Sequence, residues 1–269
     1  MRVLVLVKYV PEITSDRVMD SGRLVRDPAV GLMNELDEHA VEAALQLVEA
    51  LPDEDARESS QIIALTVAPS TGDMAIKKAY QMGAERGIRV TDDAFAGLDY
   101  HGTAAVLAAA VRRLGSDDEG PIDVVLCGLT ALDGLGSVIP AMLAEELGWP
   151  QLTHSRAVAL GADGRSLNTT RETEESVEEL TAPLPAVVSV TDAANEPRMP
   201  NFKRIMAART KAVEEWSAAD VEPFLEDFAP RVSVVDAAVH PPRVAGDVVV
   251  DRGEGGTVLA NYLIEKGLV

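Results

Sequence analysis

Residues 122–149 place the strongest limits on what this chain can fold into. The stretch begins with the apolar run 124–127, passes through a loop containing three glycines and ends in a segment of helical character. A short apolar run bounded by turn residues is typical of a parallel strand buried on both faces. Pro140 suits the first turn of the helix that follows, Gly148 suits its end, and Ser137 is placed to cap its start.

The order of strand, loop and helix in this stretch indicates an anion site. Gly128, Gly134 and Gly136 allow the backbone to turn sharply and to approach a ligand closely. A helix that begins after such a loop directs backbone N–H groups and its positive dipole end towards an anion such as a nucleotide phosphate. The spacing matches neither a Walker loop nor G-x-G-x-x-G, so an ordinary strand-to-helix turn is the alternative.

Composition excludes several classes of function. The 269 residues carry 44 acids against 24 bases, a net charge of -20, which disfavours nucleic acid and anionic membranes as partners. The opening apolar run is too short to cross a bilayer, so we expect a cytoplasmic protein without membrane insertion. The four histidines show no metal-ligand spacing and the single cysteine, Cys127, has no partner motif. We therefore expect neither a metal site nor a catalytic site.

The first half of the chain alternates between apolar strands and amphipathic helices. We expect strands at residues 3–7, 61–67 and 87–90, and helices from Asn34 or Asp37 to about residue 51, up to residue 82, and over residues 103–115. Glu38, Glu42 and Glu49 lie on the expected water-facing side of the first helix. Residues 9–28 read as an irregular surface excursion and residues 52–60 as an acidic loop. This alternation predicts an α/β fold with a Rossmann-like, doubly wound and mostly parallel sheet, whose ligand binds at the carboxyl ends of the strands.

The second half changes character twice. Antiparallel hairpins are expected over about residues 152–182, followed by a strand at 185–190, a loop at 191–200 and a helix capped by Asn201. Residues 198–211 contain five bases and no acid, which indicates a docking surface or an anion site. Residues 214–269 read as an extended C-terminal arm after a domain of residues 1–213. Its anchors Trp216, Phe224 and Phe228 bury partly on another chain in one interpretation and on their own domain in the other.

Several blocks together resemble the β subunit of electron-transfer flavoproteins, especially of the actinobacterial kind. The most specific is Asn195-Glu-Pro-Arg198 followed by Pro200-Asn-Phe-Lys-Arg-Ile-Met-Ala-Ala208. Further matches are Val5-Leu-Val-Lys8, the run Met33 to Glu42, Ala79 to Ala84, Cys127 to Thr153, Leu184 to Val188, and Pro241 to Gly246 at the start of the tail. The blocks occur in the family's order and cover essentially the whole chain.

This resemblance implies half of a redox carrier. The family pairs a β subunit, which holds a redox-inactive AMP, with an α subunit that carries most contacts to FAD, and the arm of β embraces α. Electrons come from acyl-CoA and related dehydrogenases, as in fatty acid β-oxidation, and leave to a membrane quinone oxidoreductase. The implied AMP contacts are Leu6, Asn34, Glu35, Leu36, Asp37, Val67, Gly128, Leu129, Thr130, Ala131, Leu132, Asp133, Gly134, Leu135, Gly136, Ser137, Val138 and Ile139.

The resemblance also implies a partner-recognition loop at residues 191–198, whose projecting apolar anchor falls on Ala194. The implied partner contacts are Ala194, Asn195, Glu196, Pro197, Arg198, Lys203 and Glu172. The nucleotide loop departs from the family's Asp-x-Asp-Thr-Gly-Gln, because the second acid and the Gln are absent, and this disfavours an electron-bifurcating role. The alternative function is a stand-alone adenine-nucleotide sensor without flavin. It accounts for the glycine loop but not for residues 195–198 or the arm.

Overall fold

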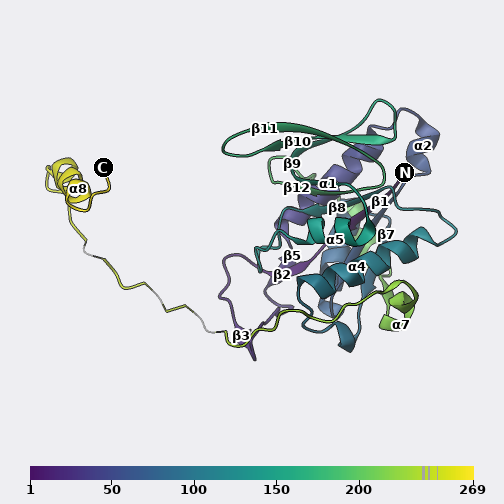
Figure 1. The fold of residues 1–269 in the computed structure, drawn as a ribbon, viewed down its shortest axis with the longest axis horizontal. Helices are drawn as coiled ribbons and strands as arrows, with labels where there is room; N and C mark the ends of the chain where they lie inside the picture. Colours follow the sequence, from purple (N-terminus) through teal and green to yellow (C-terminus); the bar gives the residue numbers. More distant parts are fainter. Residues whose placement is uncertain (238–239, 242, 247) are drawn as a thin grey trace. The chain divides into compact units, whose positions relative to one another are not determined.

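The computed structural model describes residues 1–237, 240–241, 243–246 and 248–269 (Figure 1). The chain divides into two compact units, Met1–Ala237 and Ala238–Val269. The sequence instead placed a boundary between residues 213 and 214. The difference arises because the segment after residue 213 continues the fold of the first unit.

The first unit is built on one nine-stranded sheet, which confirms the α/β fold (Figure 1). The strands are β1 (Arg2–Leu6), β6 (Gln61–Val67), β7 (Arg86–Val90), β8 (Val124–Gly128), β9 (Gln151–Leu160), β10 (Ser166–Glu172), β11 (Val177–Pro183), β12 (Ala186–Val190) and β13 (Glu214–Trp216). Their order across the sheet is β11-β10-β9-β12-β8-β1-β6-β7-β13. Neighbouring strands from β9 through β12, β8, β1, β6 and β7 to β13 run parallel, whereas β10 pairs antiparallel with both β9 and β11. The expected hairpin region therefore extends the same sheet.

Helices cover both faces of the sheet, as a doubly wound fold requires. The helices are α1 (Glu35–Glu49), α2 (Glu54–Glu58), α3 (Asp73–Met82), α4 (Tyr100–Gly115), α5 (Ile139–Leu147), α6 (Phe202–Thr210), α7 (Ala218–Val221) and, in the second unit, α8 (Gly255–Glu265). Single 3-10 turns lie at Ser70–Gly72, Asp93–Phe95 and Glu222–Phe224. Val3 and Val5 of β1 pack in a core with α1 and α3, whereas Leu4 packs in a second core with α4 and α5. Successive strand residues point to opposite faces, so a strand covered on both sides must be apolar throughout.

The strand order reverses beside β1. Chain order runs from β1 to β6 and β7 on one side, and then returns to β8 on the other side. In open α/β sheets this reversal leaves a crevice at the carboxyl ends of the two central strands, where ligands bind. Here this rule places the expected crevice between the ends of β1 and β8.

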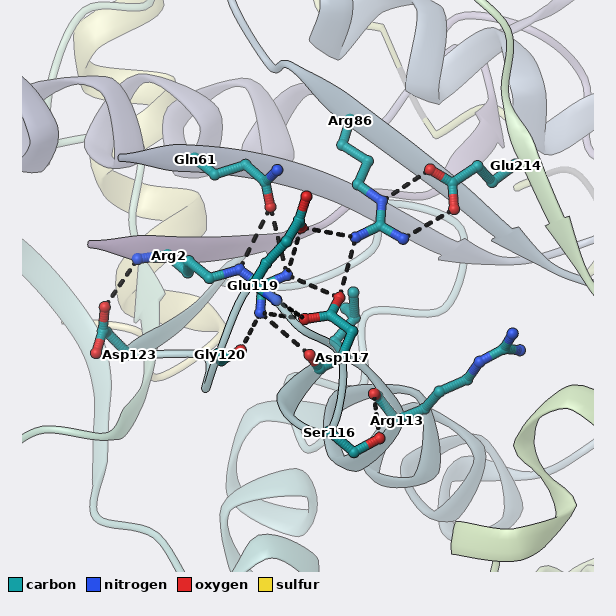
Figure 2. A network of polar contacts seen from close by, with 11 residues as sticks. Arg2, Gln61, Arg86, Arg113, Ser116, Asp117, Glu119, Gly120, Asp123 and Glu214 are labelled. Atoms are coloured by element: carbon teal, nitrogen blue, oxygen red, sulfur yellow. Dashed lines mark hydrogen bonds and ion pairs between the residues drawn. The ribbon is translucent and has the colours of Figure 1, made fainter. Parts of the chain in front are cut away.

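The opposite, amino end of the sheet is closed by a cluster of ion pairs (Figure 2). The guanidinium of Arg2 contacts Asp117 at 3.0 Å and Glu119 at 3.0 Å, and also donates to the carbonyl oxygen of Gly120. Arg86 holds Glu214 through two hydrogen bonds of 2.7 and 3.0 Å. Arg86 also reaches Asp117 and Glu119, so the two arginines share their acids. This amino-end cluster fastens the strand β13 to the sheet.

Three local expectations were wrong. Within residues 9–28, β2 (Tyr9–Pro11) is buried and pairs antiparallel with β5 (Gly31–Met33), and β3 (Met19–Asp20) pairs with β4 (Arg23–Leu24). The expected acidic loop at 52–60 contains the short helix α2. Helix α4 begins three residues before the expected start at residue 103, because the Asp99 carboxylate caps it by accepting from the N–H of Gly102 at 2.9 Å.

The aromatic anchors after residue 213 pack on this chain's own core. Trp216 is buried beneath the guanidinium of Arg113, which lies 3.9 Å from the ring centroid. Phe224 and Phe228 pack against the same core, and Phe228 meets Phe95 edge to face at 5.7 Å. All three anchors therefore contact their own domain, where Phe224 and Phe228 are half-buried. Pro242, part of the expected extended segment, lies outside the described residues, and the expected final helix is α8.

Candidate functional site

Asn34 links the start of α1 to the glycine-containing loop. Its side chain is fully buried, and its Nδ2 donates to Asp37 Oδ1 at 2.8 Å and to the carbonyl oxygen of Thr130 at 2.9 Å. Its Oδ1 accepts from the N–H of Leu132 at 3.0 Å. Asn34 occupies the cap position of α1 but makes no side-chain capping bond. Of the two expected caps, Asn34 therefore holds the cap position, but its side chain bonds to the loop after β8 instead of to the helix backbone.

Asp37 lies buried where α1 meets the ends of β1 and β8. Its Oδ2 accepts from the N–H of Lys8 at 2.8 Å. Burial raises the pKa of Asp37 to about 7, against the opposing effect of the bonds from Asn34 and Lys8. A Cβ on Gly128 would stand 2.6 Å from the backbone carbon of Leu36 and 2.7 Å from Asp37 Oδ1. Glycine is therefore required at residue 128 by close approach, so that α1 can rest directly on the end of β8.

Asp133 fixes the far part of the loop. Its carboxylate is fully buried and contacts Lys8 Nζ at 2.8 Å and Arg26 Nη2 at 2.6 Å. Burial alone would raise the pKa of Asp133, but the two cations outweigh it and hold that pKa below its usual range. Sequence reasoning missed both cations. The position of Lys8 just beyond the end of β1 was a usable signal, whereas Arg26 lies in the segment read as an irregular excursion.

The loop turns a row of backbone donors outwards just before α5. Ser137 has a φ of 53° and Val138 has a φ of -100° with a ψ of -19°, an alternation that makes consecutive N–H groups converge on an anion. Among the residues that the structure describes, the N–H groups of Gly136, Ser137 and Val138 have no hydrogen-bond partner. These N–H groups stand at the start of the nine-residue helix α5, a position that favours an anion.

Two expectations for this loop were wrong in detail. Ser137 does not cap α5, because the helix begins at Ile139 and the cap position falls on Val138, without a side-chain bond. The sharp left-handed turns fall on Leu135, with a φ of 49°, and on Ser137, and not on the glycines. Gly136 is needed for another reason, since a Cβ there would lie 2.2 Å from the hydroxyl oxygen of Tyr100. Tyr100 is a further residue of the site that sequence reasoning missed.

The remaining expected contacts line the same end of the sheet. Leu6 is buried at the end of β1, and Val67 is half-buried at the end of β6. Glu35 and Leu36 form the first turn of α1, and Leu129 and Ala131 are half-buried in the loop. The hydroxyl of Thr130 is buried without a hydrogen-bond partner in the described part of the chain. Unused backbone donors and an unpaired buried hydroxyl fit the phosphate and the hydroxyl groups of an adenylate.

The expected recognition loop is tied to α1. Asn195 exchanges bonds with His39: its Nδ2 donates to the His39 carbonyl oxygen at 2.9 Å, and its own carbonyl oxygen lies 3.0 Å from His39 Nδ1. Arg198 grips Glu42 at 2.7 Å and Glu49 at 2.6 Å. Burial would raise the pKa of Glu42, but Arg198 outweighs it and holds that pKa low. The expectation that Glu42 faces water was therefore wrong, because helical periodicity does not show which distant arginine covers a position.

The other expected partner residues differ in how firmly their side chains are held by the rest of the domain. Ala194 is half-buried and packs against the core that contains α1. Glu172 is paired with Arg156. Arg204 of the basic segment donates to the carbonyl oxygen of Met82 at 2.8 Å, whereas Lys203 is exposed.

The described residues contain neither a candidate metal cluster nor a membrane-spanning helix. Within residues 1–237, 240–241, 243–246 and 248–269, no group of three or more His, Cys, Asp or Glu side chains could hold a metal ion. Over the same ranges, no helix is both long and apolar enough to cross a membrane. Cys127 is buried, and burial raises the pKa of its thiol well above the usual range.

Comparison with known proteins identifies the family of the chain. The Electron transfer flavoprotein domain family matches residues 22–221. The Electron transfer flavoprotein subunit beta of Mycobacterium tuberculosis is 39% identical over 272 residues, and that of Mycobacterium leprae is 37% identical over 274 residues, each with 99% of both chains covered. Protein FixA of Azorhizobium caulinodans is 32% identical over 222 residues, which cover 82% of this chain and 76% of FixA. The chain therefore belongs to the electron transfer flavoprotein domain family.

Proposed function

We propose that the chain is the β subunit of a two-subunit electron carrier. With an α subunit that holds FAD, it accepts electrons from acyl-CoA and related dehydrogenases and passes them to a membrane quinone oxidoreductase. Full-length similarity to proteins named electron transfer flavoprotein subunit beta supports this role. In this proposal the chain is a cytoplasmic carrier subunit and has no enzymatic reaction of its own.

The observation that carries the proposal is the row of N–H groups at Gly136, Ser137 and Val138, which have no hydrogen-bond partner among the described residues. These donors and the start of α5 would hold the phosphate of an AMP, which explains why no free basic side chain is needed there. Asn34 and Asp133 fasten the loop from beneath, so that the donors are already in place before a ligand binds. Preorganised donors lose little conformational entropy on binding. The AMP would then act as a structural group.

FAD supplies the electron-accepting chemistry when it is bound by the partner. This chain contributes surfaces to that complex. The second unit, Ala238–Val269, is proposed as the arm that packs on the α subunit. Glu172 is proposed to meet the α subunit, and the loop with Ala194, Asn195, Glu196, Pro197 and Arg198, together with Lys203, is proposed to meet the dehydrogenase.

Co-expression with the α subunit tests this proposal. The expected product is a yellow heterodimer whose flavin is reduced when an acyl-CoA dehydrogenase and its substrate are added. A colourless monomer that binds ATP would instead support the stand-alone nucleotide sensor, and would contradict the carrier.

The role of Arg198 can be tested in the same reduction assay. We expect Arg198→Ala to slow electron acceptance without changing the flavin content. Glu42→Gln tells whether Arg198 acts by positioning the loop, because it weakens the ion pair without touching the surface of the loop. If Arg198 positions the loop, both variants are slow. If Arg198 contacts the dehydrogenase directly, Glu42→Gln behaves like the wild type.

A further inference from the structure

The position that should project towards a dehydrogenase is not free to do so in this chain. Ala194 has a short side chain, is half-buried and packs against the core. Its N–H is also bonded to the carbonyl oxygen of Thr191 at 3.2 Å. A docking anchor must reach a pocket on the partner, and this methyl group already lies against its own domain.

Large apolar side chains are exposed a few residues after Ala194. Met199 is 89% exposed, Phe202 is 77% exposed and Met206 is 44% exposed. Phe202 and Met206 are four residues apart in α6 and therefore share one face of that helix. The opposite face is fixed to the domain, because Ala208 is buried and Arg204 bonds to the end of α3. The apolar face of α6 thus points away from its own core.

The surroundings of this face are basic. Lys203 and Arg209 are exposed, and within the described ranges neither makes an ion pair. Arg209 lies seven residues after Phe202, on the same side of α6. The protein as a whole carries a net charge of -20, so this local reversal of sign selects for an acidic partner surface.

We propose that Met199, Phe202 and Met206, rimmed by Lys203 and Arg209, are the anchor that docks the electron-donating dehydrogenase. This inference rests on the proposed carrier function and names the contact surface that the function needs. The partner is a protein with an apolar pocket edged by carboxylates. A small apolar anchor with a charged rim gives fast, reversible association, and the flexible methionine side chains can fit pockets of different shapes.

The test uses the intact heterodimer and an acyl-CoA dehydrogenase reduced by its own substrate. Phe202→Ala combined with Met206→Ala should raise the KM for the heterodimer roughly tenfold or more, as for a central interface anchor. The kcat and the flavin content should change little. Val177→Ala is the control, since it removes a similarly exposed apolar side chain from β11. Arg209→Glu should raise KM about threefold and weaken the salt dependence of KM. Arg165→Glu reverses a charge in the turn after β9 and should change neither KM nor its salt dependence.

The outcomes separate the inference from the function on which it rests. An unchanged KM in the Phe202→Ala/Met206→Ala variant overturns the docking surface. Loss of the heterodimer or of its flavin in that variant also overturns it, because the α subunit would then cover this face. A wild-type heterodimer that is yellow but is never reduced by the dehydrogenase contradicts the carrier function itself.

Discussion

The two ends of the central sheet both contain buried charge, but the charged side chains hold different things in place at each end. At the amino end, Arg2 and Arg86 share Asp117 and Glu119, and each guanidinium is surrounded by acceptors (Figure 2). At the carboxyl end, Asp133 is equally enclosed by its cations, yet the loop that it fastens presents free N–H groups. A saturated cluster holds strands together, whereas a fastened loop with unpaired donors is ready for a ligand. Buried charge alone therefore does not mark a binding site in this protein.

Removing the central cation of the amino-end cluster should have the largest effect on stability. Arg2→Met leaves Asp117 and Glu119 with one arginine between them and takes away the bond to the carbonyl oxygen of Leu114. Because both acids are partly exposed, we expect the free energy of unfolding to fall by about 2–3 kcal/mol, at the low end for a buried pair. Urea denaturation measures this, with Arg165→Met as the control. The amount of bound nucleotide should not change. A loss of nucleotide in Arg2→Met would contradict the distinction drawn between the two ends of the sheet.

Adding one methyl group at the carboxyl end should affect both stability and binding. Gly128→Ala forces its Cβ against the backbone of Leu36, so α1 must move away from β8. We expect a loss of about 1–3 kcal/mol in the free energy of unfolding and of most bound nucleotide. Gly115→Ala, at the end of α4, is the matched control, because its Cβ would lie 3.9 Å from its nearest neighbour, an ordinary contact. Equal behaviour of the two variants would show that the close approach at Gly128 does not matter.

Loosening the loop should weaken binding more than folding. Asp133→Asn removes the charge that attracts Lys8 and Arg26, both of which are partly exposed. We expect a loss of about 1 kcal/mol in stability, and an AMP dissociation constant that rises about tenfold because the donors are no longer held in place. Isothermal titration with AMP provides the measurement, and Asp118→Asn is an exposed control. An unchanged affinity would mean that the loop is ordered without Asp133.

A pH dependence of stability is a further prediction that belongs to the carboxyl end. In the unfolded protein the carboxyl group of Asp37 ionises at about pH 4. In the folded protein it keeps its proton up to its pKa of about 7. Stability that is present below about pH 4 is therefore lost as the pH rises towards 7, by at most about 1.4 kcal/mol per pH unit. Asp37→Asn cannot titrate, so the stability advantage of the wild type over this variant should shrink between pH 5 and pH 7. A constant advantage in urea denaturation would show that Asp37 is already ionised at pH 5.

The sequence could predict the features that depend on local pattern, but not the contacts between residues that lie far apart in the chain. The strand Gln61–Val67 was predicted to the residue, since a strand buried on both faces must be apolar throughout. The crevice at Gly128 followed from the general rule for strand ends. The sparse anchor Trp216 could not be assigned, because an isolated aromatic residue looks the same whether it packs on its own chain or on another. The bond from Arg198 to Glu42 joins residues 156 positions apart, and no local pattern shows such a pairing.

The nucleotide loop shows the same limit at a finer scale. The sequence predicted sharp turns and close approach at its glycines, whereas the left-handed backbone conformations lie at Leu135 and Ser137. The glycines are needed because of Tyr100 and Leu36, which approach from other segments. Only the fold therefore showed why Gly128 and Gly136 have no side chain.

The most direct test of the account is to count the small molecules released from the native heterodimer. Mass spectrometry of the denatured wild-type complex should find one AMP and one FAD per heterodimer, and the Gly128→Ala complex should retain the FAD while losing most of the AMP. A wild-type complex that releases FAD but no adenylate would contradict the claim that the crevice between β1 and β8 holds a nucleotide through its backbone donors.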